Sequence, residues 1–285
     1  MFRQALDAAR EVTDDPRLHL RVLQRLAERV TEINLDHTPA LVSYDAYRVV
    51  SEVTGVADPY ARQKRETNAL ALRLLPRVRD KAVHAADPLS AALHLAALGN
   101  TIDAGIGRTD PARIEAEIMR LLGRPFRVFD IDEFRAELGP GKRLLYLGDN
   151  AGEIVFDTVL ADRIRGTGTA VTYSVKSGPI INDATREDAR TAGMEAHAAV
   201  IETGSDDIGV NFERISGEFR AAFAGADVIL AKGHGNFETC SGRPENLYFL
   251  LKAKCPMVAA ELGVELNDLV FKHSPAVSLV SSFKA

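Results

Sequence analysis

Apolar residues recur at helical spacing along the first 122 residues, and four X-Pro pairs divide this region into segments. Proline is favoured at the first position of a helix, and an Asp or Thr before it can cap the free backbone N–H groups. The pattern predicts a helix at residues 2–12 and four more that begin after Asp15, Thr38, Asp58 and Asp87. The first two of these four should reach residues 33 and 55, and Pro76 should kink or end the third.

The second part of the chain alternates short apolar runs with helical segments. The pattern changes at 124–130, where FRVF alternates and where we place the domain border. Strands are then expected at 143–147, 170–175, 198–201, 228–231, 257–260 and 269–271, and helices at 152–165, 184–192, 211–223 and 245–252. Such alternation is typical of a mainly parallel sheet with helices on both faces. We therefore expect an α/β fold: a helical N-terminal domain at residues 1–122, followed by a three-layer α/β/α core at residues 123–285.

The stretch 144–157, LLYLGDNAGEIVFD, joins an expected strand to an expected helix through a sharp turn. The turn places Asp149 and Asn150 at the carboxyl edge of the sheet, where open α/β folds bind ligands. Carboxylate and amide oxygens suit a hard divalent ion such as Mg²⁺, Mn²⁺ or Ca²⁺. Asp and Asn are also common N-caps, so a plain helix cap is the alternative for this pair.

Other strand ends carry polar side chains as well. Lys176 and Asp183 follow the strand at 170–175, although a helix cap is again an alternative for Asp183. The segment KGHGNFE, after the strand at 228–231, supplies Lys232, Asn236 and glycines that let the backbone approach a ligand, and Glu261 follows the run at 257–260. Because a parallel sheet brings such ends to one edge, these side chains are expected to form one site.

Two polar pairs lie in the helical region. Asn100 and Asp103 come at the end of an almost wholly apolar helix, three residues apart, so they share a face if the helix continues. They form either a C-terminal cap or, as we expect, part of a wall that this region contributes to the site. Lys64 and Asn68, four residues apart, have a solvated helix face as their alternative.

Composition limits the possible partners. The chain has 285 residues, 46% hydrophobic and 26% charged, as in a globular protein with an ample core. The formal net charge is −5 and no basic block stands out, so no nucleic-acid partner is expected. No apolar run matches a membrane span or a signal peptide, and two cysteines do not make a disulfide framework. We expect a cytoplasmic protein without a membrane partner, and the oligomeric state stays open.

The candidate groups fit phosphate-ester hydrolysis. Carboxylates and amides can hold a divalent ion that polarises the phosphoryl oxygen, and lysines neutralise charge that develops in the transition state. The sequence has no GxxxxGK[ST] phosphate loop and no nucleophile elbow. An S-adenosylmethionine-dependent carboxyl methyltransferase is the rival enzyme class, and a non-catalytic metabolite-binding protein is the third candidate. The turn at 148–152 is polar at its centre and the strand at 170–175 ends without an acid, which disfavours the methyltransferase cofactor.

The segments LGDNAGEIVFD, KSGPIINDAT, AKGHGNFE and LLKAKCP resemble the damage-control phosphatase family, once called domain of unknown function 89, and most closely its archaeal and bacterial subfamily I. DPYARQK with Asn68, and GNTIDAGIG, are similar to the N-terminal region of that family. The resemblance implies a helical domain on an α/β/α core and phosphatase activity supported by Mn, Co, Ni or Mg. It also implies metal binding by Asp149, Asn150 and Asp183, and places Lys232 and Asn236 in a KGxGN motif.

Two positions depart from the subfamily pattern. Its members usually carry a CxxC pair near the N-terminus, which is absent here, and His234 stands where Gln is more usual. If that pair binds metal or senses redox state, either the role is absent here or the sequence starts after the pair. The second departure could alter substrate contacts.

The resulting hypothesis is a metal-dependent phosphatase of small phosphorylated metabolites, which the resemblance suggests are damaged nucleotides or sugar phosphates. One divalent ion is expected on Asp149, Asn150 and Asp183, with waters completing its shell. Asp149, Asn150 and Lys232 are the candidate catalytic residues, with Asp149 a ligand or a nucleophile. The candidate substrate contacts are Lys176, Lys232, Asn236, Asn100, Asp103 and Glu153.

Overall fold

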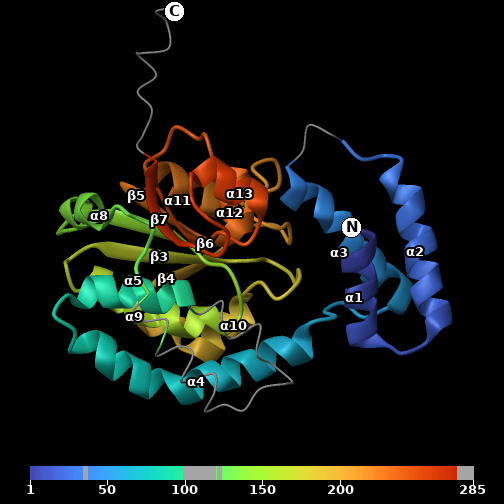
Figure 1. Ribbon diagram of the computed structural model, residues 1–285, viewed down its shortest axis with the longest axis horizontal. Coiled ribbons are helices and arrows are strands. Elements are labelled where there is room, and N and C mark those ends of the chain that lie inside the picture. The colour runs from blue at the N-terminus through green and yellow to red at the C-terminus, as the bar shows by residue number, and fades with distance from the viewer. Residues whose placement is uncertain (35–37, 99–119, 121–123, 275–285) are drawn as a thin grey trace, which may run out of the picture.

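A central β-sheet organises the computed structural model, which describes residues 1–34, 38–98, 120 and 124–274 (Figure 1). Its described strands are β1 (Val128–Phe129), β2 (Arg143–Leu147), β3 (Ala170–Val175), β4 (Ala199–Glu202), β5 (Val228–Lys232), β6 (Leu247–Lys252) and β7 (Leu269–Ser274). They are ordered β1-β7-β6-β5-β2-β3-β4. The run from β6 to β4 is parallel, and among the described strands only the β6–β7 pair is antiparallel. The predicted α/β fold with a mainly parallel sheet is confirmed.

Helices cover both faces of this sheet. One face carries α4 (Ala61–Val83), α5 (Pro88–Leu98), α8 (Ile131–Glu137), α9 (Glu153–Arg165) and α10 (Arg186–Ala192), and the other α11 (Gly217–Gly225), α12 (Gly233–Cys240) and α13 (Pro256–Leu262). Side chains along β2 alternate between the two hydrophobic cores, with Tyr146 in the first and Leu145 in the second. Because β2 pairs in parallel with both β3 and β5, the carboxyl ends of these three strands lie side by side at one edge of the sheet.

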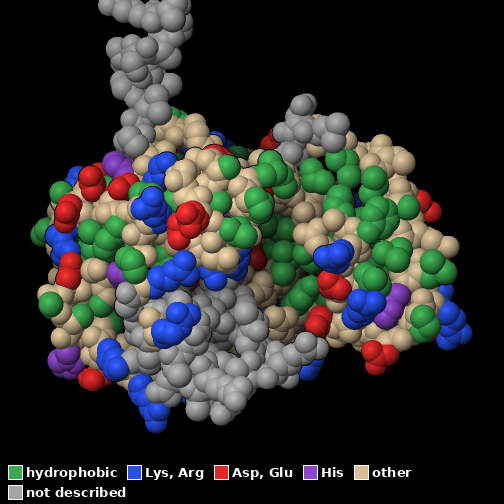
Figure 2. All heavy atoms as spheres, viewed as in Figure 1, with side chains coloured by type: hydrophobic (Ala, Val, Ile, Leu, Met, Phe, Trp, Pro, Cys, Tyr) green, Lys and Arg blue, Asp and Glu red, His purple; other side chains and the backbone are tan. Residues whose placement is uncertain are grey.

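The first three helices form a bundle with a core of its own. They are α1 (Phe2–Val12), α2 (Pro16–Val30) and α3 (Pro39–Thr54), and they pack against Ile180 from the loop after β3. Figure 1 shows the bundle at one end of the molecule, whereas α4 and α5 pack with α9 on the sheet. In Figure 2, hydrophobic side chains gather over the bundle and at the edges of a hollow beside the α/β part. The predicted domain border at residue 123 stays a prediction.

Two predicted elements near the C-terminus have the wrong type of secondary structure. Residues 247–252 form strand β6 instead of a helix, and residues 256–262 form helix α13 instead of a strand. LYFLLK is apolar without a helical period because β6 is buried on both faces of the sheet, and such a run cannot be told from a buried helix by pattern alone. Pro256 at the first helical turn and Gly263, with a φ of 68°, mark both ends of α13. Glu261 therefore does not stand at a strand end.

Some predicted boundaries were also wrong. The glycine-rich segment after β5 forms a helix that was not predicted from the sequence, since α12 starts at Gly233. Helix α4 continues through Pro76, so the alternative that this proline ends the helix is wrong, whereas the alternative of a kink stays a prediction. Helix α2 ends at Val30, three residues before the predicted end, and α11 starts at Gly217 after a Ser216 cap that accepts a bond from Phe219 N at 3.0 Å. Among the described helices, none is both long enough and apolar enough to cross a membrane.

Candidate active site

The turn after β2 orients Asn150 through its amide nitrogen. Asn150 Nδ2 donates to Glu153 Oε1 at 2.8 Å and to Asp149 Oδ2 at 3.1 Å. An amide placed between two carboxylates presents its NH₂ group to them, so its oxygen is directed elsewhere. The cap alternative for the Asp149–Asn150 pair is wrong, because the residue before α9 is Gly152 and no side chain caps that helix.

Asp183 lies against this turn. The backbones of residues 150 and 183 pair antiparallel, through bonds from Ala151 N to Asn182 O and from Ala184 N to Asp149 O, each 2.8 Å long. The cap alternative for Asp183 is also wrong, because Thr185 and Asp188 form the capping box of α10. The backbone pairing thus brings the three predicted metal ligands to one place at the sheet edge.

The electrostatics of this place favour a cation. Burial, followed by the carboxylates of Glu153 and Asp183, raises the pKa of Asp149 well above its ordinary value. Burial likewise raises the pKa of Asp183 to about 6, against the opposing effect of Lys176. Lys176 Nζ lies 3.6 Å from Asp183 Oδ2 and also donates to the carbonyl of Gly209. Burial and the neighbouring carboxylates thus outweigh the nearby lysines in their effect on both pKa values, a balance that a bound cation would shift.

A hard divalent ion fits this donor set. Among the residues that the structure describes, no three His, Cys, Asp or Glu side chains are grouped closely enough to hold a metal. The candidate ligands are instead two carboxylates and one amide, which suit Mg²⁺ or Mn²⁺ with waters in the remaining positions. The oxygen of Asn150 is the group that its hydrogen bonds leave for this purpose.

Lys232 is buried behind the turn. The residue is 2% exposed, and Nζ lies 2.6 Å from Asp157 Oδ1 and 2.8 Å from Glu153 Oε2. Burial lowers the pKa of Lys232, but these two carboxylates outweigh burial and raise it above the ordinary value. The ammonium is therefore engaged by carboxylates of α9, and the predicted phosphate contact of Lys232 stays a prediction. Tyr173 completes the cluster by donating to Asp157 Oδ2 at 2.7 Å.

The β5–α12 turn packs closely on the candidate ligands. Gly233 has a φ of 84°, and a Cβ there would lie 2.0 Å from Asp149 Oδ2, so only glycine fits. Asn236 Nδ2 donates to the carbonyls of Gly148, at 3.0 Å, and Lys232, at 2.8 Å. In the described contacts Asn236 therefore fixes the backbone of the turn. His234 contacts the backbone of residues 252 and 254.

Helix α4 also holds the turn in place. Asn68, 2% exposed, accepts a 2.6 Å bond from Gly152 N and donates to Asp188 Oδ1 at 2.8 Å. Lys64, 5% exposed, pairs with Asp58 at 2.9 Å and Asp188 at 3.5 Å. The solvated-face alternative for Lys64 and Asn68 is wrong. Asn100 and Asp103 lie outside the described residues, so their predicted place in the wall stays a prediction.

Sequence reasoning missed Asp157 and the role of Glu153 as the link between Asn150 and Lys232. One signal was present, because the two acids are four residues apart and so share one face of α9.

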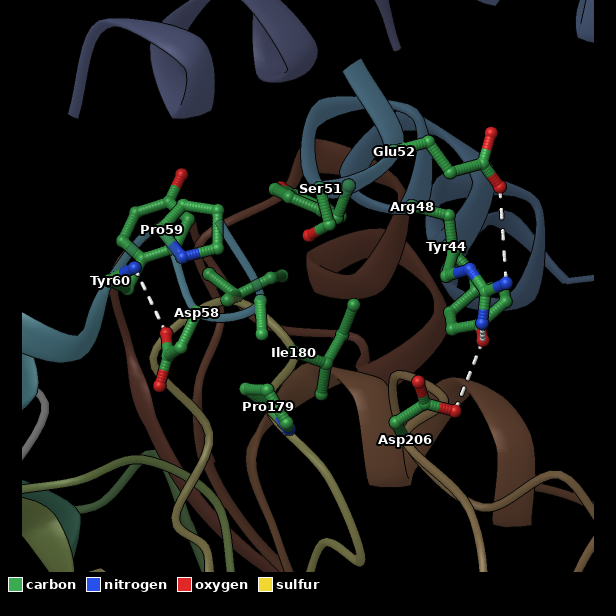
Figure 3. Close-up of a pocket in the computed structure, with 13 residues that line it drawn as sticks. Tyr44, Arg48, Ser51, Glu52, Asp58, Pro59, Tyr60, Pro179, Ile180 and Asp206 are labelled. Carbon is green, nitrogen blue, oxygen red and sulfur yellow. Dashed lines mark hydrogen bonds and ion pairs between the residues drawn. The ribbon is translucent and has the colours of Figure 1, made fainter. Parts of the chain in front are cut away.

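A cavity of about 390 Å³ opens between α3 and the loop after β3 (Figure 3). One stripe of α3 lines it, with Tyr44, Tyr47, Arg48, Ser51 and Glu52. Pro179, Ile180 and Ile181 line the opposite side, and their loop continues directly to Asp183.

The structure is an α/β protein in which two carboxylates and an amide, at positions 149, 150 and 183, gather at the carboxyl edge of a mainly parallel sheet. Residues 1–270 match the damage-control phosphatase ARMT1-like domain, and the chain belongs to that family. The resemblance found in the sequence motifs is thereby confirmed.

Relatives cover nearly the whole chain. A damage-control phosphatase of Pyrococcus horikoshii is 38% identical over 84% of this chain and 83% of its own, and one of Archaeoglobus fulgidus is 35% identical over 93% of each. An uncharacterised protein of Methanocaldococcus jannaschii is 35% identical over 95% of this chain and 91% of its own. The crystal structure of a DUF89 family protein from P. horikoshii superposes with a TM-score of 0.88, at 34% identity and 95% coverage of both chains.

Proposed function

We propose that this chain is a divalent-metal-dependent phosphatase of small phosphorylated metabolites, such as damaged nucleotides or sugar phosphates. The phosphatase names of two relatives support the reaction class. The observation that supports the metal dependence is the pairing of residues 150 and 183, which gathers two carboxylates and an amide in a buried place where burial and neighbouring carboxylates raise the pKa of Asp149.

In this proposal Asp149, Asn150 and Asp183 hold the ion by their side-chain oxygens. When bound, the ion supplies a Lewis acid for the phosphoryl oxygen and a water of lowered pKa. Lys176, beside Asp183, adds a positive charge where a phosphate dianion would approach.

Two buried side chains, Glu153 and Lys232, position the candidate ligands in this proposal. Glu153 accepts the Asn150 amide and so keeps the Asn150 oxygen directed at the cation. Lys232 forms an ion pair with each of the two buried acids of α9 and so holds Glu153 in its place beside Asn150.

Purified protein stripped of metal tests the proposal. Phosphate release from p-nitrophenyl phosphate should appear on adding Mn²⁺, Co²⁺, Ni²⁺ or Mg²⁺, and Asp149→Ala should abolish it. Asp132→Ala, which removes an exposed carboxylate of α8, is the matched control and should retain the activity. Equal phosphate release without metal, or metal-independent methyl transfer from S-adenosylmethionine, would reject the proposal.

A further inference from the structure

The ammonium of Lys176 lies between two acceptors at the carboxyl end of β3. The residue is 3% exposed, its Nζ donates to the carbonyl of Gly209, and Nζ lies 3.6 Å from Asp183 Oδ2. A charge-assisted hydrogen bond between an ammonium and a carboxylate is about 2.7–2.9 Å long, so Lys176 does not approach Asp183 as closely as it could. The position of the ammonium therefore depends on where the Gly209 carbonyl lies.

Gly209 belongs to a short segment, residues 208–210, that packs against α12. Val210 N donates to Thr239 Oγ1 at 2.9 Å, and Thr239 Oγ1 donates to Gly235 O at 2.8 Å. Gly209 has a φ of 70°, and a Cβ there would lie 2.2 Å from Gly235 O. The backbones of segment 208–210 and α12 are thus in direct contact, which fixes the direction of the Gly209 carbonyl.

This contact gives the second glycine of the KGHGNFE segment a task. Gly235 lies inside α12 and does not have a positive φ, so alanine would suit its backbone conformation. Space is what excludes a side chain, because a Cβ would lie 2.9 Å from Ile208 Cγ2 and 3.0 Å from Gly209 N. The sequence predicts that these glycines let the backbone approach a ligand, whereas in the structure segment 208–210 approaches Gly235.

We propose that Gly235 and Thr239 are positioning residues for Lys176. By holding segment 208–210 against α12, they place the Gly209 carbonyl where it keeps the ammonium from pairing more closely with Asp183. Asp183 then stays available to the divalent ion, and the ammonium stays directed at the phosphate beside it. The inference rests on the proposed function for the ion and the phosphate, but the positioning itself can be measured by binding.

Thr239→Val tests the positioning, because it removes the acceptor of Val210 N. Once the Gly209 carbonyl is displaced, the ammonium should move closer to Asp183 and compete with the ion. The Mn²⁺ affinity measured by calorimetry should therefore fall by about tenfold. Thr239→Ser keeps the hydroxyl and should have the wild-type affinity. Wild-type affinity in Thr239→Val, or an equal loss in Thr239→Ser, would overturn the proposal.

Gly235→Ala tests the same contact without removing a hydrogen bond. Its Cβ should displace segment 208–210 and lower the Mn²⁺ affinity by about fivefold, since overpacking shifts the neighbouring backbone. Gly217→Ala is the control, because it also lies in a helix, α11, but has nothing within 4 Å of the added Cβ. Circular dichroism checks that each variant folds, and Gly235→Ala decides alone if Thr239→Val does not. Wild-type affinity in a folded Gly235→Ala would overturn the proposal.

A double-mutant cycle with Lys176→Met shows whether these effects act through the lysine. In the Lys176→Met background, neither Thr239→Val nor Gly235→Ala should lower the Mn²⁺ affinity further, since no ammonium is left to compete. A merely structural role of the two residues would give the same loss in both backgrounds. Equal losses with and without Lys176 would overturn the proposal.

These binding measurements also separate the inference from the proposed function. A loss of Mn²⁺ affinity that depends on Lys176 supports the positioning even if the wild type releases no phosphate from p-nitrophenyl phosphate. Metal-dependent phosphate release together with wild-type Mn²⁺ affinity in both variants would leave the function standing and overturn the positioning. No binding of Mn²⁺, Co²⁺, Ni²⁺ or Mg²⁺ by the wild type would overturn both.

Discussion

Replacing Lys232 by Met should destabilise the protein strongly, because it removes the cation between two buried acids. Lys232, Glu153 and Asp157 are 2%, 1% and 0% exposed, and the ammonium lies 2.8 Å and 2.6 Å from the two carboxylates. Breaking a buried ion pair by removing one partner costs about 3–5 kcal/mol. Because two carboxylates lose the same partner and face each other across one turn of α9, we expect the upper end of that range.

The pH dependence provides a signature of this cause. Burial holds the pKa of Asp157 above its ordinary value even with Lys232 present, and removing the lysine should raise it further. A carboxyl group with a folded pKa above its unfolded pKa binds protons more readily in the native state. The loss of stability should therefore be complete above the folded pKa and shrink as the pH falls through it towards the unfolded pKa.

Urea unfolding followed by circular dichroism at a series of pH values measures this effect. Lys142→Met, at an exposed lysine, is the control and should change the free energy of unfolding by less than about 0.5 kcal/mol. Adding Asp157→Asn to Lys232→Met should recover part of the loss, since one uncompensated charge disappears. A loss below about 1 kcal/mol, a loss that grows as the pH falls, or no recovery in the double variant would refute the reasoning.

Two further substitutions test the positioning of the candidate ligands. Glu153→Gln should weaken Mn²⁺ binding by about tenfold in calorimetry. The Glu153 carboxylate uses one oxygen for Asn150 and the other for Lys232, whereas the amide has only one acceptor oxygen. Unchanged Mn²⁺ affinity would show that Glu153 does not orient Asn150. Gly233→Ala should lose both Mn²⁺ binding and at least about 1 kcal/mol of stability, since its Cβ would lie 2.0 Å from Asp149 Oδ2. Gly242→Ala is its control, with a φ of 75° and open space around the Cβ, so it should show the backbone strain and keep the affinity.

The sequence predicted the parts of the fold that have clear local signals. Apolar runs bounded by turns identified β2, β3 and β5, and the X-Pro pairs identified the starts of α2 and α3. The order of parallel strands then made it possible to expect Asp149 and Asp183 at one edge. The exchange of β6 and α13 occurred where a strand buried on both faces has no period and a short helix has few residues.

The buried contacts of the candidate site depend on tertiary structure. Asp157 and Lys232 are 75 residues apart, and Asn68 and Gly152 are 84 apart, so no local pattern relates them. The cavity likewise forms between α3 and a loop more than a hundred residues later in the chain. Sequence patterns indicated which side chains carry chemistry, but not which of them would be buried against one another.

Helix α3 has a consequence for how such a protein can diversify. The helix supplies one wall of the cavity but none of the candidate ligands at positions 149, 150 and 183. Two hydrogen bonds connect it to the α/β part, one from Ala40 N to Glu238 Oε2 and one from Tyr44 to Asp206. Substitutions along its lining stripe can therefore reshape the cavity without touching the candidate ligands. This wall can vary by single mutations while the side chains at the sheet edge stay as they are.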